Sequence, residues 1–254
     1  MTESQANDFA DDQVTAERAA AAIRIIAAAL DGIAKAGSSQ SLAPTTTQRV
    51  FLLAYGWFAS VVRTGQLIAV GHENGLRHEC APSARTVLQY SLALQWLIEG
   101  GDPATDAVEA DAERRAYDLV KELNDTGWPI PAGFTMQVST RPAKSGALEE
   151  QIDNFKAMCK LYQGGDQLYV PFRLTSGYAH PSWVGAQAYL NTEKGELSPI
   201  AVTDSHAHLV DTARSVILAG HAFATLLVDK SLADEVASAE KVLGTPFALW
   251  QRLP

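Results

Sequence analysis

The sequence predicts an all-α protein, a single bundle of about eight helices with a short β-hairpin near residues 187–202. Apolar residues recur every three or four positions through most of the 254 residues, as on the buried face of a helix. Glycines, prolines and capping residues bound these periodic segments. Residues 187–202 instead alternate around a turn sequence, "TEKGE". Residues 1–12 are acidic and polar, so we expect a disordered tail there and one helical domain over residues 13–254.

The first three helices are expected over about residues 14–36, 48–70 and 83–99. Gly37 ends the first, and the pair Gly100-Gly101 ends the third. The second helix is apolar on most sides, which indicates a central position in the bundle.

A fourth helix has a clear start, because Asp102 is a capping residue and Pro103 suits a first turn. It is expected to end near residues 124–127. The next segment, 127–146, contains three prolines and three glycines without periodicity. Such long irregular segments inside a domain are typical of functional or mobile loops.

A fifth helix carries apolar residues from Leu148 to Tyr162 and ends at Gly164. A sixth covers part of residues 166–180, where Pro171 marks either the first turn or a kink.

The last helices are bounded by clear signals. Asp204 is expected to cap a long seventh helix, and an eighth runs from Ser231 until Gly244. The C-terminal segment keeps Phe247 and Trp250, which predicts that it docks on the bundle.

Composition limits the function. The net charge is −9 with a pI near 5.1, which argues against a general nucleic-acid coating role and against a DNA partner. The N-terminus has no signal-peptide pattern. The longest apolar run, residues 50–62, is shorter than the roughly 20 residues of a membrane span. We therefore expect a soluble cytoplasmic protein without a membrane partner.

Common catalytic motifs are absent from the sequence. There is no phosphate-binding glycine loop, no dinucleotide fingerprint and no serine-nucleophile elbow. "HENGL" (72–76) has a leucine where a zinc-protease motif needs its second histidine. Cys80 in "RHEC" is preceded by a histidine two positions earlier, but nothing presents the thiol, so we interpret it as a structural cysteine.

Metal-ligand types gather in "TDSHAHLVD" (203–211), as Asp204, His206, His208 and Asp211. On a helix, residues two apart diverge by about half a turn, so the favoured interpretation is a capped helix start with solvated polar residues. The alternative is a metal-dependent hydrolase that uses His180 with His206 and His208. We expect no intrinsic metal site and no cofactor.

"FRLTSGYAHPSW" (172–183) places Arg173 and His180 seven positions apart. This spacing resembles the Arg-x6-His motif of HEPN-type helical bundles, some of which are metal-independent endoribonucleases that act as homodimers in toxin or phage-defence systems. The resemblance implies that Arg173 stabilises phosphate charge and that His180 is the acid–base group, with RNA as the partner. Leu174 departs from that pattern, since those nucleases tend to have a small polar residue there. Arg214 and His221 have the same spacing and are interpreted as an edge of the core.

A broader resemblance rests on "ARTVLQYSLALQWL" (84–97) and "LTSGYAHPSW" (174–183), which look like an uncharacterised bacterial all-helical family. Gln89 stands where that family has an acid.

The leading prediction is a helical-bundle protein that binds a partner or small ligand in a polar pocket. Arg85 and Gln89 form a polar stripe on an otherwise apolar helix. Ser176 and His180 share a face four residues apart, and Pro181 makes His180 a helix-terminal residue. Buried polar groups need partners, so we expect Arg85, Gln89, Ser176 and His180 around one pocket, with His180 pointing inward.

Overall fold

The computed structural model describes residues 13–37, 40–129, 140–144, 146–191, 195–201 and 206–254, and it confirms an all-α bundle with one hairpin. The helices are α2 (Gln13–Ala36), α3 (Gln48–Glu73), α4 (Ala81–Thr126), α5 (Ala147–Asp153), α6 (Phe155–Cys159), α7 (Gly165–Ala179), α8 (Trp183–Gln187), α9 (Ala207–Ala224) and α10 (Ser231–Leu243). The antiparallel hairpin pairs β1 (Leu190–Asn191) with β2 (Glu196–Leu197) in the register Leu190↔Leu197, inside the predicted segment. None of the described helices has the length and apolar composition of a membrane span.

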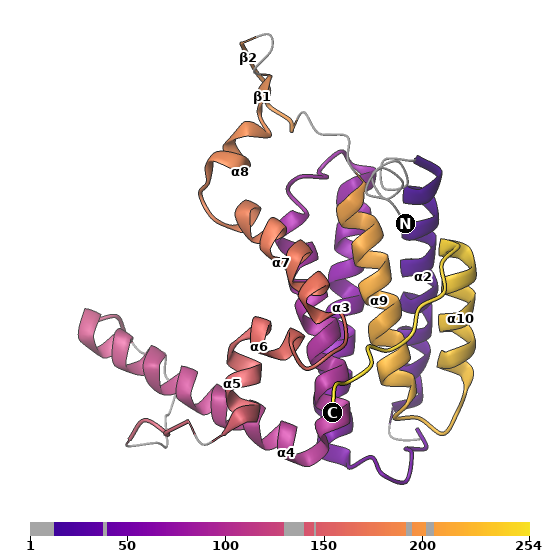
Figure 1. The fold of residues 1–254 in the computed structure, drawn as a ribbon, viewed down its shortest axis with the longest axis vertical. Helices are drawn as coiled ribbons and strands as arrows, with labels where there is room; N and C mark the ends of the chain where they lie inside the picture. Colours follow the sequence, from indigo (N-terminus) through magenta and orange to yellow (C-terminus); the bar gives the residue numbers. More distant parts are fainter. Residues whose placement is uncertain (1–12, 38–39, 130–139, 145, 192–194, 202–205) are drawn as a thin grey trace.

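The bundle is built from α2, α3, α9, α10 and the first half of α4, which lie side by side in Figure 1. The second half of α4 runs away from it, and α7, α8 and the hairpin flank the other end (Figure 1). Phe58 of α3 and Phe223 of α9 stack in the core with ring centroids 4.8 Å apart. Helices α9 and α10 approach closely at Gly220, where a Cβ atom would lie 2.7 Å from Val236 Cγ2.

The glycine pair that predicted a helix boundary forms a kink instead of a loop. Gly101 has φ 59° and ψ −142°, and helical geometry resumes directly at Asp102 and Pro103, so α4 continues in a new direction. Thr47 Oγ1 donates a hydrogen bond of 2.7 Å to Asp102 Oδ1 and ties the kink to the start of α3. The kink directs the second half of α4 away from the bundle.

The predicted fifth helix is divided in two, which the sequence pattern missed. Asn154 adopts an extended conformation, and its side chain accepts hydrogen bonds from the backbone N–H groups of Lys156 and Ala157. This cap ends α5 and starts α6. In contrast, α7 continues through Pro171, so proline interrupts one backbone hydrogen bond without ending the helix.

The end signals near the C-terminus are confirmed. Gly244, with φ 82°, ends α10 in the left-handed conformation that favours glycine. Phe247 and Trp250 pack against the core, as predicted for the tail. The expected Asp204 cap, the N-terminal tail and residues 130–139 lie outside the described residues, and His206 occupies the N-cap position of α9.

Candidate functional site

A mostly apolar pocket of about 300 Å³ lies between α4, α7, α9 and the C-terminal tail. We call it the tail pocket, and its lining residues are Leu88, Gln167, Leu168, Pro171, Asp211, Arg214, Ser215, Leu218, Phe247, Ala248 and Trp250. Its size is at the lower end of small-molecule sites, which are concave, largely apolar and oriented by a few polar groups.

The tail that closes this pocket is held by side chains of the bundle. Gln95, which is buried in α4, donates from Nε2 to the Trp250 carbonyl (2.6 Å) and accepts from the Trp250 N–H at Oε1 (3.1 Å). Glu240 of α10 accepts the Phe247 N–H at 2.7 Å, and its other partner is His221 Nε2 at 2.8 Å. The tail is therefore a fixed wall of the pocket.

The polar groups of the tail pocket are concentrated on α9. Arg214 Nη1 lies 3.3 Å from Asp211 Oδ1, one turn earlier. Burial among the atoms of the pocket raises the pKa of Asp211, and the guanidinium of Arg214 opposes that rise. The pair presents both hydrogen-bond acceptors and donors to an otherwise apolar space.

The four residues predicted to share a pocket make no hydrogen bond with one another in the part of the chain that is described. The Arg85 guanidinium stacks on the ring of Phe172, 4.4 Å from its centroid, and no described residue forms a hydrogen bond with its buried Nε. Ser176 Oγ donates to the Phe172 carbonyl within α7 (2.6 Å), and Gln89 is half-buried. The packing of α4 on α7 is thus present, and a shared pocket stays a prediction.

His180 is the C-cap of α7, as the proline predicts, but its expected inward orientation is wrong. Its backbone is extended (φ −127°, ψ 153°) because Pro181 disfavours helical geometry at the preceding residue. The chain leaves the helix there, and His180 is exposed. Arg173 is also exposed, and neither residue forms an ion pair with another described residue.

Four of the six histidines gather at one end of the bundle, a grouping that links two segments that the sequence presents as separate motifs. The rings of His72 (α3) and His206 (start of α9) lie 6.2 Å apart. His78 contacts Tyr178 edge-on at 4.9 Å, and Tyr178 contacts His208 at 5.7 Å. The interpretation of solvated polar residues is wrong for His206, which is buried.

His72 is the most perturbed member of this group. Its ring is buried, and in the part of the chain that the structure describes neither ring nitrogen has a hydrogen-bond partner. Burial lowers its pKa to about 4, with further lowering by the charges of His206, His208 and Arg77. Burial likewise lowers the pKa of His208. Among the described residues, no three metal-ligand side chains converge on one point, so the grouping of His180 with His206 and His208 is not seen there.

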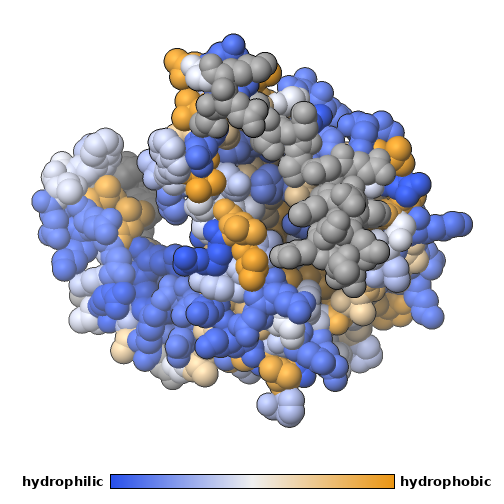
Figure 2. All heavy atoms as spheres, turned by 45° about the horizontal axis from the view of Figure 1, so that its top comes forward, coloured by the Kyte–Doolittle hydropathy of each residue, from blue (hydrophilic) through white to orange (hydrophobic). Residues whose placement is uncertain are grey.

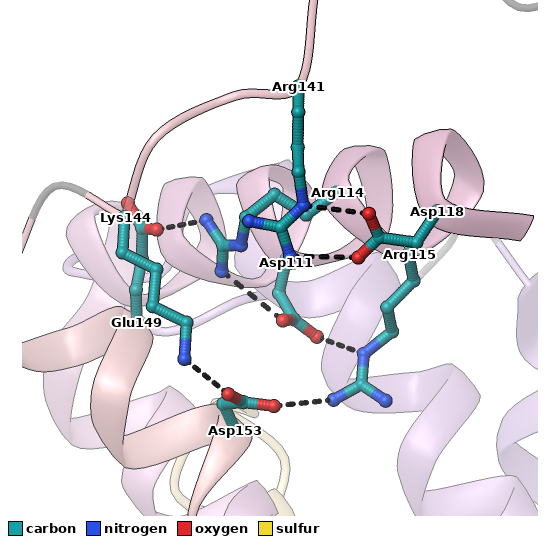
Figure 3. Close-up of polar contacts among 8 residues, drawn as sticks. All are labelled: Asp111, Arg114, Arg115, Asp118, Arg141, Lys144, Glu149 and Asp153. Carbon is teal, nitrogen blue, oxygen red and sulfur yellow. Dashed lines mark hydrogen bonds and ion pairs between the residues drawn. The ribbon is translucent and has the colours of Figure 1, made fainter. Parts of the chain in front are cut away.

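A charged network lies where the second half of α4 meets α5 (Figure 3). Arg114 is 2% exposed and pairs with Glu149 of α5 and with Asp111, 3.2 Å away. Arg115 and Lys144 both reach Asp153, and Arg141 makes two hydrogen bonds to Asp118. Each carboxylate faces a cation, so the network anchors α5 and residues 140–144 to α4 rather than forming a reactive centre.

Both cysteines are buried. Cys80 packs against Gly71 and its Sγ lies 3.8 Å from the Ile68 carbonyl, in line with a structural role. Burial raises its pKa, and burial raises that of Cys159 to about 12.

Sequence reasoning identified the helices that meet at the tail pocket but not its residues. The sequence pattern marks Asp211 only as a metal-ligand residue type and Arg214 only by its spacing to His221. The ion pair at positions 211 and 214 is one helical turn apart, a spacing that could have indicated it. Comparison of the chain with family models, with curated proteins and with solved structures finds no match.

Proposed function

We propose that this protein binds a small, mainly apolar molecule in the tail pocket, with the polar end of the ligand against Asp211 and Arg214. The observation that carries the proposal is a pocket of about 300 Å³ whose wall, the C-terminal tail, is pinned by Gln95 and Glu240. A wall held at both sides preorganises the pocket, so that less conformational entropy of the tail is lost when a ligand binds.

The polar end of the ligand follows from the ion pair. Asp211 and Arg214 together carry no net charge when both are ionised, and they offer an acceptor and a donor side by side. A neutral head group that both donates and accepts, such as a primary amide, matches this pair. A free carboxylate meets repulsion from Asp211, and an ammonium group meets repulsion from Arg214.

Three probes of one size test this chemistry: benzamide, benzoate and benzylammonium, followed by saturation-transfer NMR and by titration of protein resonances. Fragments of this size bind with Kd values of about 1 mM or weaker, and we expect benzamide to bind most tightly. Ala248→Trp places a large side chain at the pocket and should weaken benzamide binding at least fivefold. Ala233→Trp, on the exposed face of α10, is the matched control. Equal binding of benzamide to both variants would contradict the proposal.

A second candidate function is a metal-independent endoribonuclease that uses Arg173 and His180. The observation that favours it is that both side chains are exposed, Arg173 on α7 and His180 just after it. The same helix exposes Val170 and Leu174, and Trp183, which follows it in the chain, is 69% exposed. An arginine and a histidine that reach solvent beside apolar side chains are available to a second copy of the chain and to RNA. On the face shown in Figure 2 the hydrophobic side chains form several separate patches on a mainly hydrophilic surface.

Cleavage of single-stranded RNA in EDTA tests this candidate. Arg173→Ala and His180→Ala should each abolish cutting while circular dichroism stays unchanged. Arg63→Ala, at an exposed position of α3, is the matched control. Cutting that persists in both α7 variants would identify a contaminating nuclease and end this hypothesis.

A further inference from the structure

A small polar cavity of about 140 Å³ lies at the histidine end of the bundle, away from the tail pocket. We call it the histidine cavity. It lies between α2, the end of α3 and the start of α9, and its lining includes Glu17, Arg24, His72, Glu73, Arg77 and His206. The two cavities share no lining residue.

His72 is the residue of this cavity whose polar atoms a bound ligand would satisfy. The residue is 7% exposed, yet Nδ1 and Nε2 are both buried and have no hydrogen-bond partner among the described residues. Buried polar atoms in folded proteins are nearly always paired, because leaving one unpaired costs its lost hydration. An imidazole has one donor and one acceptor when neutral and two donors when protonated, so a polar occupant of the cavity would satisfy it.

The charges around His72 decide what kind of occupant fits. The groups whose electrostatic effects reach His72 are His206, His208 and Arg77, and all of them lower its pKa as neighbouring cations do. Of the lining carboxylates, Glu73 is paired with Arg24, and Glu17 accepts a hydrogen bond from Gln13 at the exposed side. The positive end of the α9 dipole also begins at His206.

These observations disfavour a divalent cation. In the described parts of the chain no third ligand joins His72 and His206 around one point. The positive charge of Arg77 that acts on His72 would also repel a metal ion placed there. The same charges and the same unpaired ring nitrogens favour an anion, which gains a charge-assisted hydrogen bond when the imidazole takes up a proton.

We propose that the histidine cavity binds a small tetrahedral oxyanion, a phosphate group, through His72, His206 and Arg77. The volume of about 140 Å³ accommodates a phosphate group but not a whole nucleotide. The phosphate group is either inorganic phosphate or the end of a small phosphorylated molecule, and its negative charge favours protonated His72.

Calorimetric titration with inorganic phosphate at about pH 5.5, in two buffers of different ionisation enthalpy, tests the proposal. We expect binding with proton uptake. His72→Gln and Arg77→Gln should each weaken binding at least fivefold, while the matched control Arg63→Gln, at an exposed position of α3, should leave it unchanged. A parallel titration with phosphoserine separates the two sources, since tighter binding than phosphate indicates a phosphorylated molecule.

Imidazole NMR of the unmodified protein keeps the proposal testable if His72→Gln does not fold. Added phosphate should raise the pKa of His72 from about 4 by one unit or more and should leave the resonances of His221, in the last turn of α9, in place. Resonances of His72 that do not respond to about 20 mM phosphate, well above a Kd of about 1 mM, would overturn the proposal. Zn²⁺ binding that is lost in His72→Gln, with no phosphate response, would overturn it in favour of a metal site.

Discussion

Replacing Arg114 with methionine should destabilise the protein by about 3–5 kcal/mol. Arg114 is 2% exposed, and its guanidinium pairs with Glu149 and with Asp111 at 3.2 Å. Both carboxylates are buried, so the substitution would leave them facing each other without the cation between them (Figure 3). Removing one partner of a buried ion pair costs more than the pair itself contributes, because the remaining charge stays desolvated.

The remaining Arg115–Asp111 ion pair limits the size of the effect. Arg115 Nε remains 2.6 Å from Asp111 and compensates that carboxylate, so most of the cost falls on Glu149. The double variant Arg114→Met/Glu149→Leu removes both charges and fills their space with apolar atoms. It should recover at least half of the loss, because apolar replacements of a buried ion pair are often neutral or stabilising.

Urea denaturation followed by circular dichroism, together with hydrogen exchange of the α5 amides, measures both effects. The exchange data show whether α5 detaches before the bundle unfolds, since Glu149 lies on α5. A loss below about 1 kcal/mol in Arg114→Met, or a double variant less stable than the single one, would refute the idea that a desolvated charge dominates.

Three further predictions concern other parts of the fold. In phosphate-free buffer the free energy of unfolding should fall by about 3 kcal/mol between pH 6.5 and 4 through His72, because its pKa is lowered from 6.5 to about 4 and the unfolded chain takes up the proton first. The effect is the difference between the pH–stability curves of the parent protein and of His72→Leu, and parallel curves would contradict it. Gln95→Leu should lower the free energy of unfolding by about 1–3 kcal/mol, because the Trp250 backbone loses both of its hydrogen-bond partners. The tail should then become accessible to chymotrypsin at Phe247, and unchanged cleavage would show that side-chain packing alone holds the tail. Arg85→Ala should lower the free energy of unfolding by about 1–3 kcal/mol through the lost packing on Phe172. Urea denaturation measures this, and an unchanged midpoint would contradict it.

Local sequence patterns predict the helical elements and most of their ends. Helix ends are predicted by Gly37 and Gly244, and buried faces by the spacing of apolar residues. Both are predictable because these preferences act within one or two turns of the chain. The hairpin and the docking of the tail by Phe247 and Trp250 follow from equally local patterns. Even His180 as a helix-terminal residue needed only the proline after it.

Which of these elements meet could not be predicted, because their contacts join residues far apart in the sequence, and a local pattern carries no information on such contacts. The sequence predicts a helix end at Gly101, but the backbone angles of this residue produce a kink, after which α4 continues outward. His72 and His206 are far apart in sequence, and their rings lie 6.2 Å apart because α3 ends where α9 begins. The burial of Arg114 likewise depends on α5 folding back over α4, a long-range contact that a charged helix surface does not reveal.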